Sequence, residues 1–213
     1  MNITHIQLLH GCLLSSIAHA IMTNEYPELA YEQSWDGNNF STQDGCGLRG
    51  TITFVDNACV GAIRNEHKKA IQGYDAIKVC MSDFPDMLQL TAEQEALQYL
   101  FVDYKNQYVP AVTSLFWCDD DGLHISRDCA EAFQNDISLF ESCCLPVDLE
   151  IQALSDYYNM NSNARRLLYD LWEKKKDCFS QEIFLSKEQK AMIPGSQIHI
   201  ACKESLSELN ILV

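Results

Sequence analysis

The spacing of apolar residues predicts helices at both ends of the chain and strands between them. Near the start, apolar side chains recur every three or four residues, which predicts an amphipathic helix over residues 6–22. Residues 30–64 change to short strand-like segments separated by Gly-containing turns, a pattern typical of a β-meander. Residues 76–81 predict a further strand, and a capping box then begins a helix predicted over residues 91–104.

The second half of the chain alternates in the same way. An apolar, β-branched segment, an Asp-Asp-Asp-Gly turn and a short return predict an acidic hairpin over residues 109–126. Helical patterns follow over residues 129–193, and the last of them begins at a capping box formed by Ser186 and Gln189. Residues 197–202 predict a late strand.

Together these elements predict an α+β protein, in which an antiparallel meander and hairpins pack against about five to six helices. With 213 residues, of which 47% are hydrophobic, the chain is long enough to bury a substantial core. It contains no internal repeat and no Pro-rich or Gly/Ser-rich linker. We therefore expect one compact domain over residues 1–213.

Acidic residues dominate the charge. The chain has 30 Asp and Glu against 15 Lys and Arg, a formal net charge of −15. Between residues 103 and 156 eleven acidic residues stand against Lys105 and Arg127. They are Asp103, Asp119, Asp120, Asp121, Asp128, Glu131, Asp136, Glu141, Asp148, Glu150 and Asp156. Such a field favours encounter with basic partners and repels nucleic-acid backbone and anionic membrane, so no direct contact with either is expected.

Ten cysteines raise the question of the compartment. They form no C-x-x-C pair, and most lie within apolar or amphipathic segments, as thiols of a reducing cytosol do. The first twenty residues include a lipobox-like Leu9–Cys12 and a cleavage-like Ala18–Ala20. However, no Lys or Arg precedes the apolar segment, which His10 and His19 interrupt. The pattern favours a cytoplasmic protein over an exported one.

Cys12, Ser15 and His19 share one face of the predicted first helix. A thiol near an imidazole is the combination used by cysteine-dependent hydrolases and transferases, so Cys12 with His19 forms an alternative catalytic hypothesis. In such enzymes the nucleophile normally lies at the first turn of its helix, where the dipole lowers the thiol pKa. Cys12 is expected in the second turn, which favours a packing role.

Other common chemistries find no support in the sequence. The cysteines and histidines lack the paired spacing of structural zinc, and the Asp119–Gly122 turn lacks the alternating ligands of a calcium loop, so no metal site is expected. The segment Gly45–Gly50 lacks the Lys and Ser/Thr of a phosphate-binding loop. Lys174–Lys176 forms the only basic cluster, at the predicted end of a helix. No cofactor is expected.

Two tryptophans stand beside acidic residues, an arrangement that favours contacts with a basic partner because the ring provides area and the carboxylates steer. The alternative is that both rings cover the core. The predicted partner-binding residues are Trp117, Asp119, Asp120, Asp121, Asp128 and Glu131, with Trp35 and Asp36.

The sequence therefore favours a soluble, acidic, cytoplasmic binding protein that neutralises a basic protein, most plausibly an immunity protein or antitoxin that blocks a toxin. The second hypothesis is the cysteine-dependent hydrolase or transferase that uses Cys12 with a histidine. The third is a nucleic-acid mimic that occupies a DNA-binding protein. The identity of the partner and the oligomeric state stay open.

Overall fold

The computed structural model describes residues 3–213 and has an α+β fold, as the apolar pattern predicts. Contacts between Cα atoms group the chain into two compact units. Unit 1 comprises residues 1–8 and 37–141, and unit 2 comprises residues 9–36 and 142–213. The expectation of one compact domain stays a prediction.

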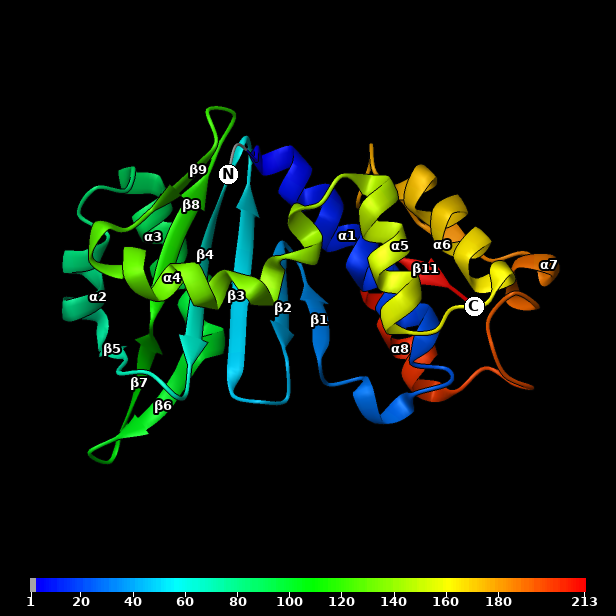
Figure 1. Cartoon of the computed structure of the whole chain (residues 1–213), viewed down its shortest axis with the longest axis horizontal. Coiled ribbons are helices and arrows are strands. Elements are labelled where there is room, and N and C mark those ends of the chain that lie inside the picture. Colours follow the sequence, from blue (N-terminus) through cyan, green and yellow to red (C-terminus); the bar gives the residue numbers. More distant parts are fainter. Residues whose placement is uncertain (1–2) are drawn as a thin grey trace. The chain divides into compact units, whose positions relative to one another are not determined.

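Two antiparallel sheets form the centre of unit 1 (Figure 1). The larger has neighbouring strands in the order β2 (Asn39–Gln43), β3 (Leu48–Val55), β4 (Ala58–Asn65), β8 (Ser114–Cys118) and β9 (Leu123–Ile125). The smaller has the order β5 (Ile71–Gln72), β7 (Gln107–Val112) and β6 (Phe101–Tyr104). The helices of unit 1 are α2 (Tyr74–Cys80), α3 (Asp86–Gln94) and α4 (Ala130–Asp136), with 3-10 turns η2 (Ala96–Leu100), η3 (Arg127–Cys129) and η4 (Ile137–Phe140).

Both faces of β4 and β8 are covered, which explains their nearly continuous apolar sequence. One face packs with α2, α3 and η2 in a core that includes Ile77, Leu88 and Leu97. On the other face Phe116 meets Phe133 of α4 edge to face, with ring centroids 5.5 Å apart. In Figure 1, α4 crosses in front of β4 and β8.

Helices make up most of unit 2 (Figure 1). They are α1 (His5–Met22), which belongs to this unit from Leu9 onward, α5 (Val147–Tyr157), α6 (Ser162–Lys175), α7 (Lys187–Lys190) and α8 (Ile200–Glu208). The unit also has 3-10 turns η1 (Pro27–Leu29) and η5 (Ser142–Cys144) and the strands β1 (Gln33–Asp36), β10 (Ile183–Phe184) and β11 (Ile211–Leu212). The strands β10 and β11 pair in parallel.

The first helix lies where the sequence predicts it, but every residue from Gly11 to its end at Met22 is buried, so it is not amphipathic over its length. Among the described residues it is the one helix long and apolar enough to cross a membrane, and 78% of it is buried inside the protein, as in a core helix. Gly11 allows a neighbouring segment to approach closely. A Cβ atom there would lie 2.0 Å from the backbone oxygen of Cys143.

The strand predicted over residues 76–81 is wrong, because this segment belongs to α2. Ile77 and Met81, four residues apart, are both fully buried in the core of unit 1. Residues four positions apart lie on the same face of a helix, so this burial pattern fits a helix and not a strand. An apolar segment of six residues does not by itself distinguish a strand from a short buried helix.

The helix predicted over residues 91–104 is also wrong in extent. The helix α3 begins earlier, at Asp86, and ends at Gln94, and Phe101–Tyr104 forms β6, which pairs with β7. The buried residues of α3, Leu88 and Ala92, precede most of the predicted segment. Pairing with β7 overrides the local helical pattern at the end of that segment.

The late strand predicted over residues 197–202 is wrong, because Ile200–Glu208 forms α8. His199 caps this helix, since its Nδ1 atom accepts a 3.2 Å hydrogen bond from the Ala201 backbone N–H. Cys202 and Leu206 form the buried face. The last strand of the chain is β11.

Several predictions for residues 109–193 are confirmed. The Asp-Asp-Asp-Gly turn joins β8 to β9, although the preceding apolar segment breaks after Val112 into β7 and β8. Ser186 and Gln189 form a capping box for α7. The helix α6 is capped by Asn161, whose side chain accepts hydrogen bonds from the backbone N–H groups of Asn163 and Ala164.

Candidate functional sites

The acidic turn between β8 and β9 is shaped by Asp119. Its Oδ1 atom accepts hydrogen bonds from the backbone N–H groups of Asp121, at 2.9 Å, and Gly122, at 3.2 Å. The same oxygen lies 3.4 Å from Nε2 of His124 on the returning strand. Asp119 therefore holds the turn in place, whereas the acidic residues around it are left to solvent.

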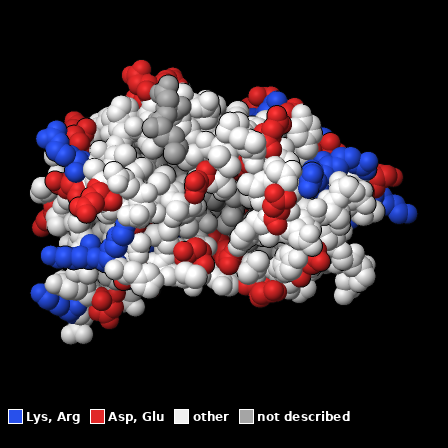
Figure 2. Space-filling view, in the orientation of Figure 1, with Lys and Arg blue, Asp and Glu red and all other residues white. Residues whose placement is uncertain are grey.

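Four carboxylates before and after β9 are exposed. Asp120 and Asp121 lie in the turn that precedes this strand, and Asp128 in η3 and Glu131 in α4 follow its other end. The side chain of Asp120 is 73% exposed and lies 3.1 Å from Nδ1 of His5, which belongs to the same unit. Within residues 3–213, no Lys or Arg forms an ion pair with any of the four. Figure 2 shows acidic side chains gathered where the β8–β9 turn projects.

Trp117 is half-buried, and two neighbouring aromatic rings cover part of its indole ring. The ring stacks on the His124 imidazole with a centroid distance of 3.8 Å and an interplanar angle of 11°. Phe84 packs nearby at 6.5 Å. Trp117 thus connects the core of unit 1 to the acidic turn and offers a partner only part of its ring.

Trp35 and Asp36, the other predicted partner-binding residues, lie in β1 of unit 2. Trp35 is only 4% exposed, and its ring packs 4.6 Å from that of Phe179. Its backbone N–H donates a 2.9 Å hydrogen bond to the Glu208 carboxylate. The Trp35 ring therefore covers the core, which is the alternative that the sequence left open, and its role as a partner anchor stays a prediction. Asp36 is exposed.

Two of the eleven acidic residues in the central segment are not on the surface. Asp136 is fully buried in unit 1, where its carboxylate accepts hydrogen bonds from Thr113 Oγ1 at 2.6 Å, Ser114 Oγ at 2.7 Å, Lys68 Nζ at 2.9 Å and Asn65 Nδ2 at 3.1 Å. Burial raises the pKa of Asp136, but these hydrogen bonds outweigh burial and leave the pKa below its ordinary value. This carboxylate is structural.

Glu150 is the second buried acid, and its environment is the opposite. Among residues 3–213, neither carboxyl oxygen has a hydrogen-bond partner. Burial, with a smaller contribution from the neighbouring Cys143 thiol, raises the pKa of Glu150 to about 11. Glu150 is therefore protonated and uncharged at neutral pH, and it adds nothing to the acidic field.

The alternative catalytic residues, Cys12 and His19, both lie on α1 but not within reach of each other. They are seven residues apart, which corresponds to about 10 Å along a helix. Burial raises the pKa of the Cys12 thiol, and its hydrogen bond to Cys143 raises it further. A nucleophilic cysteine needs the reverse shift. The geometry favours the packing role of Cys12.

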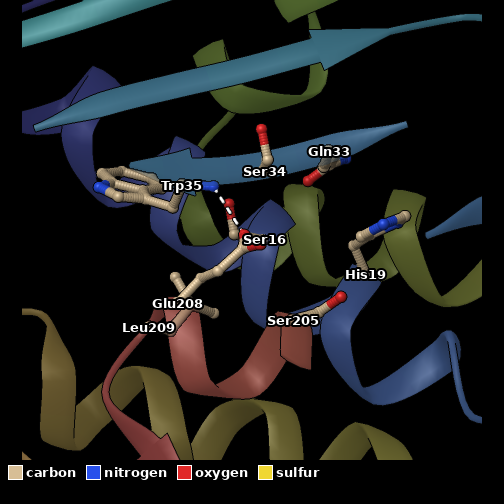
Figure 3. Close-up of a pocket in the computed structure, with 8 residues that line it drawn as sticks. All are labelled: Ser16, His19, Gln33, Ser34, Trp35, Ser205, Glu208 and Leu209. Carbon is tan, nitrogen blue, oxygen red and sulfur yellow. Dashed lines mark hydrogen bonds between the residues drawn. The ribbon is translucent and has the colours of Figure 1, made fainter. Parts of the chain in front are cut away.

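His19 lines a small pocket formed by α1, β1 and α8 (Figure 3). A 3.0 Å hydrogen bond joins its Nδ1 atom to the Tyr158 hydroxyl, and its Nε2 atom has no partner among the described residues. Burial lowers the pKa of His19 to about 4, so the imidazole is neutral at pH 7. The open space measures about 10 Å³, which admits about one water molecule and no substrate.

A wider groove of about 560 Å³ runs along α5 and α6. It is open to solvent, and Arg165, Arg166 and Asp148 are among its lining residues. Charges of both signs line it, so it has no clear preference for an anion or a cation. Across residues 3–213, no group of three or more His, Cys, Asp or Glu side chains is placed to hold a metal ion.

Comparisons with protein-family models, curated proteins and solved structures found no match. The functional argument therefore rests on the chemistry of the sites themselves.

Proposed function

We propose that this protein binds a basic protein partner through an acidic hairpin surface, defined as Asp120, Asp121, Asp128 and Glu131 with the exposed part of Trp117. By covering the partner it would act as an immunity protein or antitoxin acts on a toxin. Its compartment, on this proposal, is the cytoplasm, where the ten thiols stay reduced.

The observation that carries the proposal is the placement of exposed acids at both ends of β9, whose His124 stacks on the half-buried Trp117 ring. These four exposed carboxylates have no Lys or Arg ion-pair partner among residues 3–213. Other exposed acids of unit 1, such as Asp83 and Glu141, also have none, so the placement of the four beside Trp117 and His124 is what distinguishes them. Exposed carboxylates at both ends of a strand that covers a half-buried aromatic ring steer a cationic partner and pair with it on arrival.

Asp119 supports this surface without being part of it. Its carboxylate is already committed to the turn and to His124, so its replacement would change the shape of the hairpin as well as the charge. A charge-reversal test is cleaner at Asp120, Asp121 and Glu131. These three side chains are exposed, and none accepts a hydrogen bond from the backbone of the turn.

The test is affinity capture from the native host with the parent chain and two triple variants. The hairpin variant carries Asp120→Lys, Asp121→Lys and Glu131→Lys. The control variant carries the same change of charge at three exposed acids of the same unit, Asp83, Asp103 and Glu141. We expect the parent and the control to retain one specific basic protein and the hairpin variant to lose it. Equal capture by all three chains would exclude this surface.

A further inference from the structure

Two cysteines lie side by side on adjacent strands of the larger sheet of unit 1. Cys59 in β4 and Cys118 at the end of β8 are direct partners in the antiparallel ladder. Directly opposed residues in such a ladder have Cα atoms about 4.5–5.5 Å apart and side chains on the same face of the sheet. A disulfide requires a Cα separation of about 4.4–6.8 Å, so the backbone already satisfies this condition.

The two thiols also interact with each other. A hydrogen bond joins them, and this bond lowers the pKa of the Cys118 thiol by more than burial and the nearby Asp119 and Asp120 charges raise it. Burial raises the pKa of the Cys59 thiol. Cys118 is therefore the thiol that ionises more readily and attacks first, and Cys59 is the one that follows.

We propose that Cys59 and Cys118 form a redox-modifiable dithiol, which a low-molecular-weight disulfide converts to a cross-strand disulfide. The Cys118 thiolate attacks one sulfur of the small disulfide, forms a mixed disulfide and releases the first small thiol. Cys59 then attacks Cys118 Sγ, forms the protein disulfide and releases the second small thiol. The protein loses two electrons and two protons, and the small disulfide gains them.

Access to this pair comes from the end of the strand. Both sulfur-bearing side chains are fully buried, but Cys118 is the last residue of β8 and directly precedes the acidic turn. The β8–β9 ladder has three residue pairs, and the Cys118 thiol also donates a 3.1 Å hydrogen bond to the Ile3 backbone oxygen. Local opening of this hairpin end together with the segment at Ile3 exposes Cys118 without unfolding the unit. The acidic turn also implies that a cationic disulfide reacts faster than an anionic one.

A second thiol pair in unit 2 provides a comparison. Cys12 and Cys143 are also joined by a hydrogen bond, but both lie in the interior beside α1 and no ladder fixes their backbone separation. Among residues 3–213, neither exposed cysteine, Cys46 or Cys178, is hydrogen-bonded to another thiol, so a small disulfide is expected to give mixed disulfides there.

The test exposes the folded, reduced full chain to cystamine, a cationic disulfide, and in parallel to oxidised glutathione, an anionic one. Acid stops the reaction, free thiols are alkylated, and proteolytic peptides are mapped by mass spectrometry. We expect a cross-linked peptide that joins Cys59 to Cys118 with loss of two hydrogen atoms, formed several-fold faster with cystamine. Cys118→Ser should abolish this peptide, whereas Cys178→Ser should leave it unchanged.

Two further measurements distinguish loss of the disulfide from a failure of the variant to fold. Oxidised parent should unfold at a higher urea concentration than reduced parent, and dithiothreitol should reverse the shift. Cys59→Ala, which keeps a small apolar side chain at this buried position, should fold and show no shift on oxidation. Mixed disulfides at Cys46 and Cys178 alone, with no peptide joining Cys59 to Cys118 in the folded parent, would overturn the proposal.

Discussion

The hydroxyl of Thr113 donates a 2.6 Å hydrogen bond to the carboxylate of Asp136 at the point where β7 ends and β8 begins. The same hydroxyl lies 3.2 Å from the backbone oxygen of Ile63. Thr113, between β7 and β8, thus connects Ile63 near the end of β4 to Asp136 at the C-terminal end of α4. The break that interrupts the predicted hairpin is therefore held by a buried charged network rather than by loop flexibility.

Asp136→Ala should lower the free energy of unfolding by about 3 kcal/mol, because it leaves Lys68 and two hydroxyl groups without their buried acceptor. The folded pKa lies below the unfolded value of about 3.9, so this stabilisation is complete above about pH 4 and is lost as the pH falls through the folded pKa. Urea unfolding of both chains between pH 3 and pH 7 measures this. A variant as stable as the parent at pH 7 would contradict it.

Glu150 should have the opposite pH dependence. Its folded pKa of about 11 lies above the unfolded value of about 4.3, so the unfolded state releases the proton first. The free energy of unfolding then falls by about 1.4 kcal/mol for each pH unit between these values. Glu150→Gln keeps the shape of the protonated side chain and removes its ionisable group. This variant should be more stable than the parent by about 2 kcal/mol or more at pH 7.

The stabilisation by Glu150→Gln should disappear as the pH approaches 4, where the unfolded glutamate is also protonated. Glu141→Gln provides the matched control, because Glu141 is exposed. It should change the free energy of unfolding by less than about 0.5 kcal/mol at any of these pH values. Denaturation curves at pH 4.5, 6 and 8 separate the two variants, and a parallel pH dependence would show that Glu150 is not buried with its proton.

The close approach at Gly11 leads to a third prediction. Alanine is the better helix former by about 1 kcal/mol, but its Cβ atom would lie 2.0 Å from the Cys143 backbone oxygen. Gly11→Ala should therefore lower the free energy of unfolding by about 2 kcal/mol despite the gain in propensity. Ile6→Ala, at an exposed position of the same helix, serves as the control. Thermal melts would contradict the structure if Gly11→Ala were the more stable chain.

Elements with a long apolar period could be predicted from the sequence, and short ones could not. Of the two predicted capping boxes, the one at Ser186 forms, whereas Thr91 lies inside α3, where its hydroxyl donates a 2.9 Å hydrogen bond to the Met87 backbone oxygen. The helix α1 repeats its apolar spacing over several turns, and the side chains of the Ser186 capping box determine their own local geometry. The segments at residues 76–81 and 197–202 are too short to show a period. Their structure depends on packing against elements that are distant in the sequence.

The candidate site could be predicted only in part, because a sequence does not show which acids are buried. Asp120 and Asp136 carry the same charge in the same acidic segment, yet Asp120 is exposed and Asp136 is fully enclosed. Trp35 and Trp117 likewise both stand beside acids, and only Trp117 retains exposed area. Burial of each side chain follows from tertiary packing, which local composition does not determine.

The thiols give a fourth prediction. The ten cysteines, all within residues 3–213, form no disulfide with one another, and only Cys46 and Cys178 are exposed. Protein purified from a reducing cytosol should therefore accept two alkyl groups rapidly when folded and ten after unfolding without reductant. Intact mass spectrometry before and after addition of urea counts them. Five intramolecular disulfides in freshly isolated protein would contradict both this prediction and the proposed cytoplasmic location.

The acidic hairpin surface gives the last prediction, which concerns rates rather than capture. Once the basic partner is known, the variant with Asp120→Lys, Asp121→Lys and Glu131→Lys should associate at least about tenfold more slowly than the parent at low salt, because it replaces attraction with repulsion. The difference should shrink as salt rises toward about 1 M, where the screening length falls to about 3 Å. Stability should change little, since all three positions are exposed.

Stopped-flow association at two ionic strengths measures these rates, with the variant at Asp83, Asp103 and Glu141 as the control. If both variants slowed association equally, the net charge of the protein, and not this surface, would steer the partner.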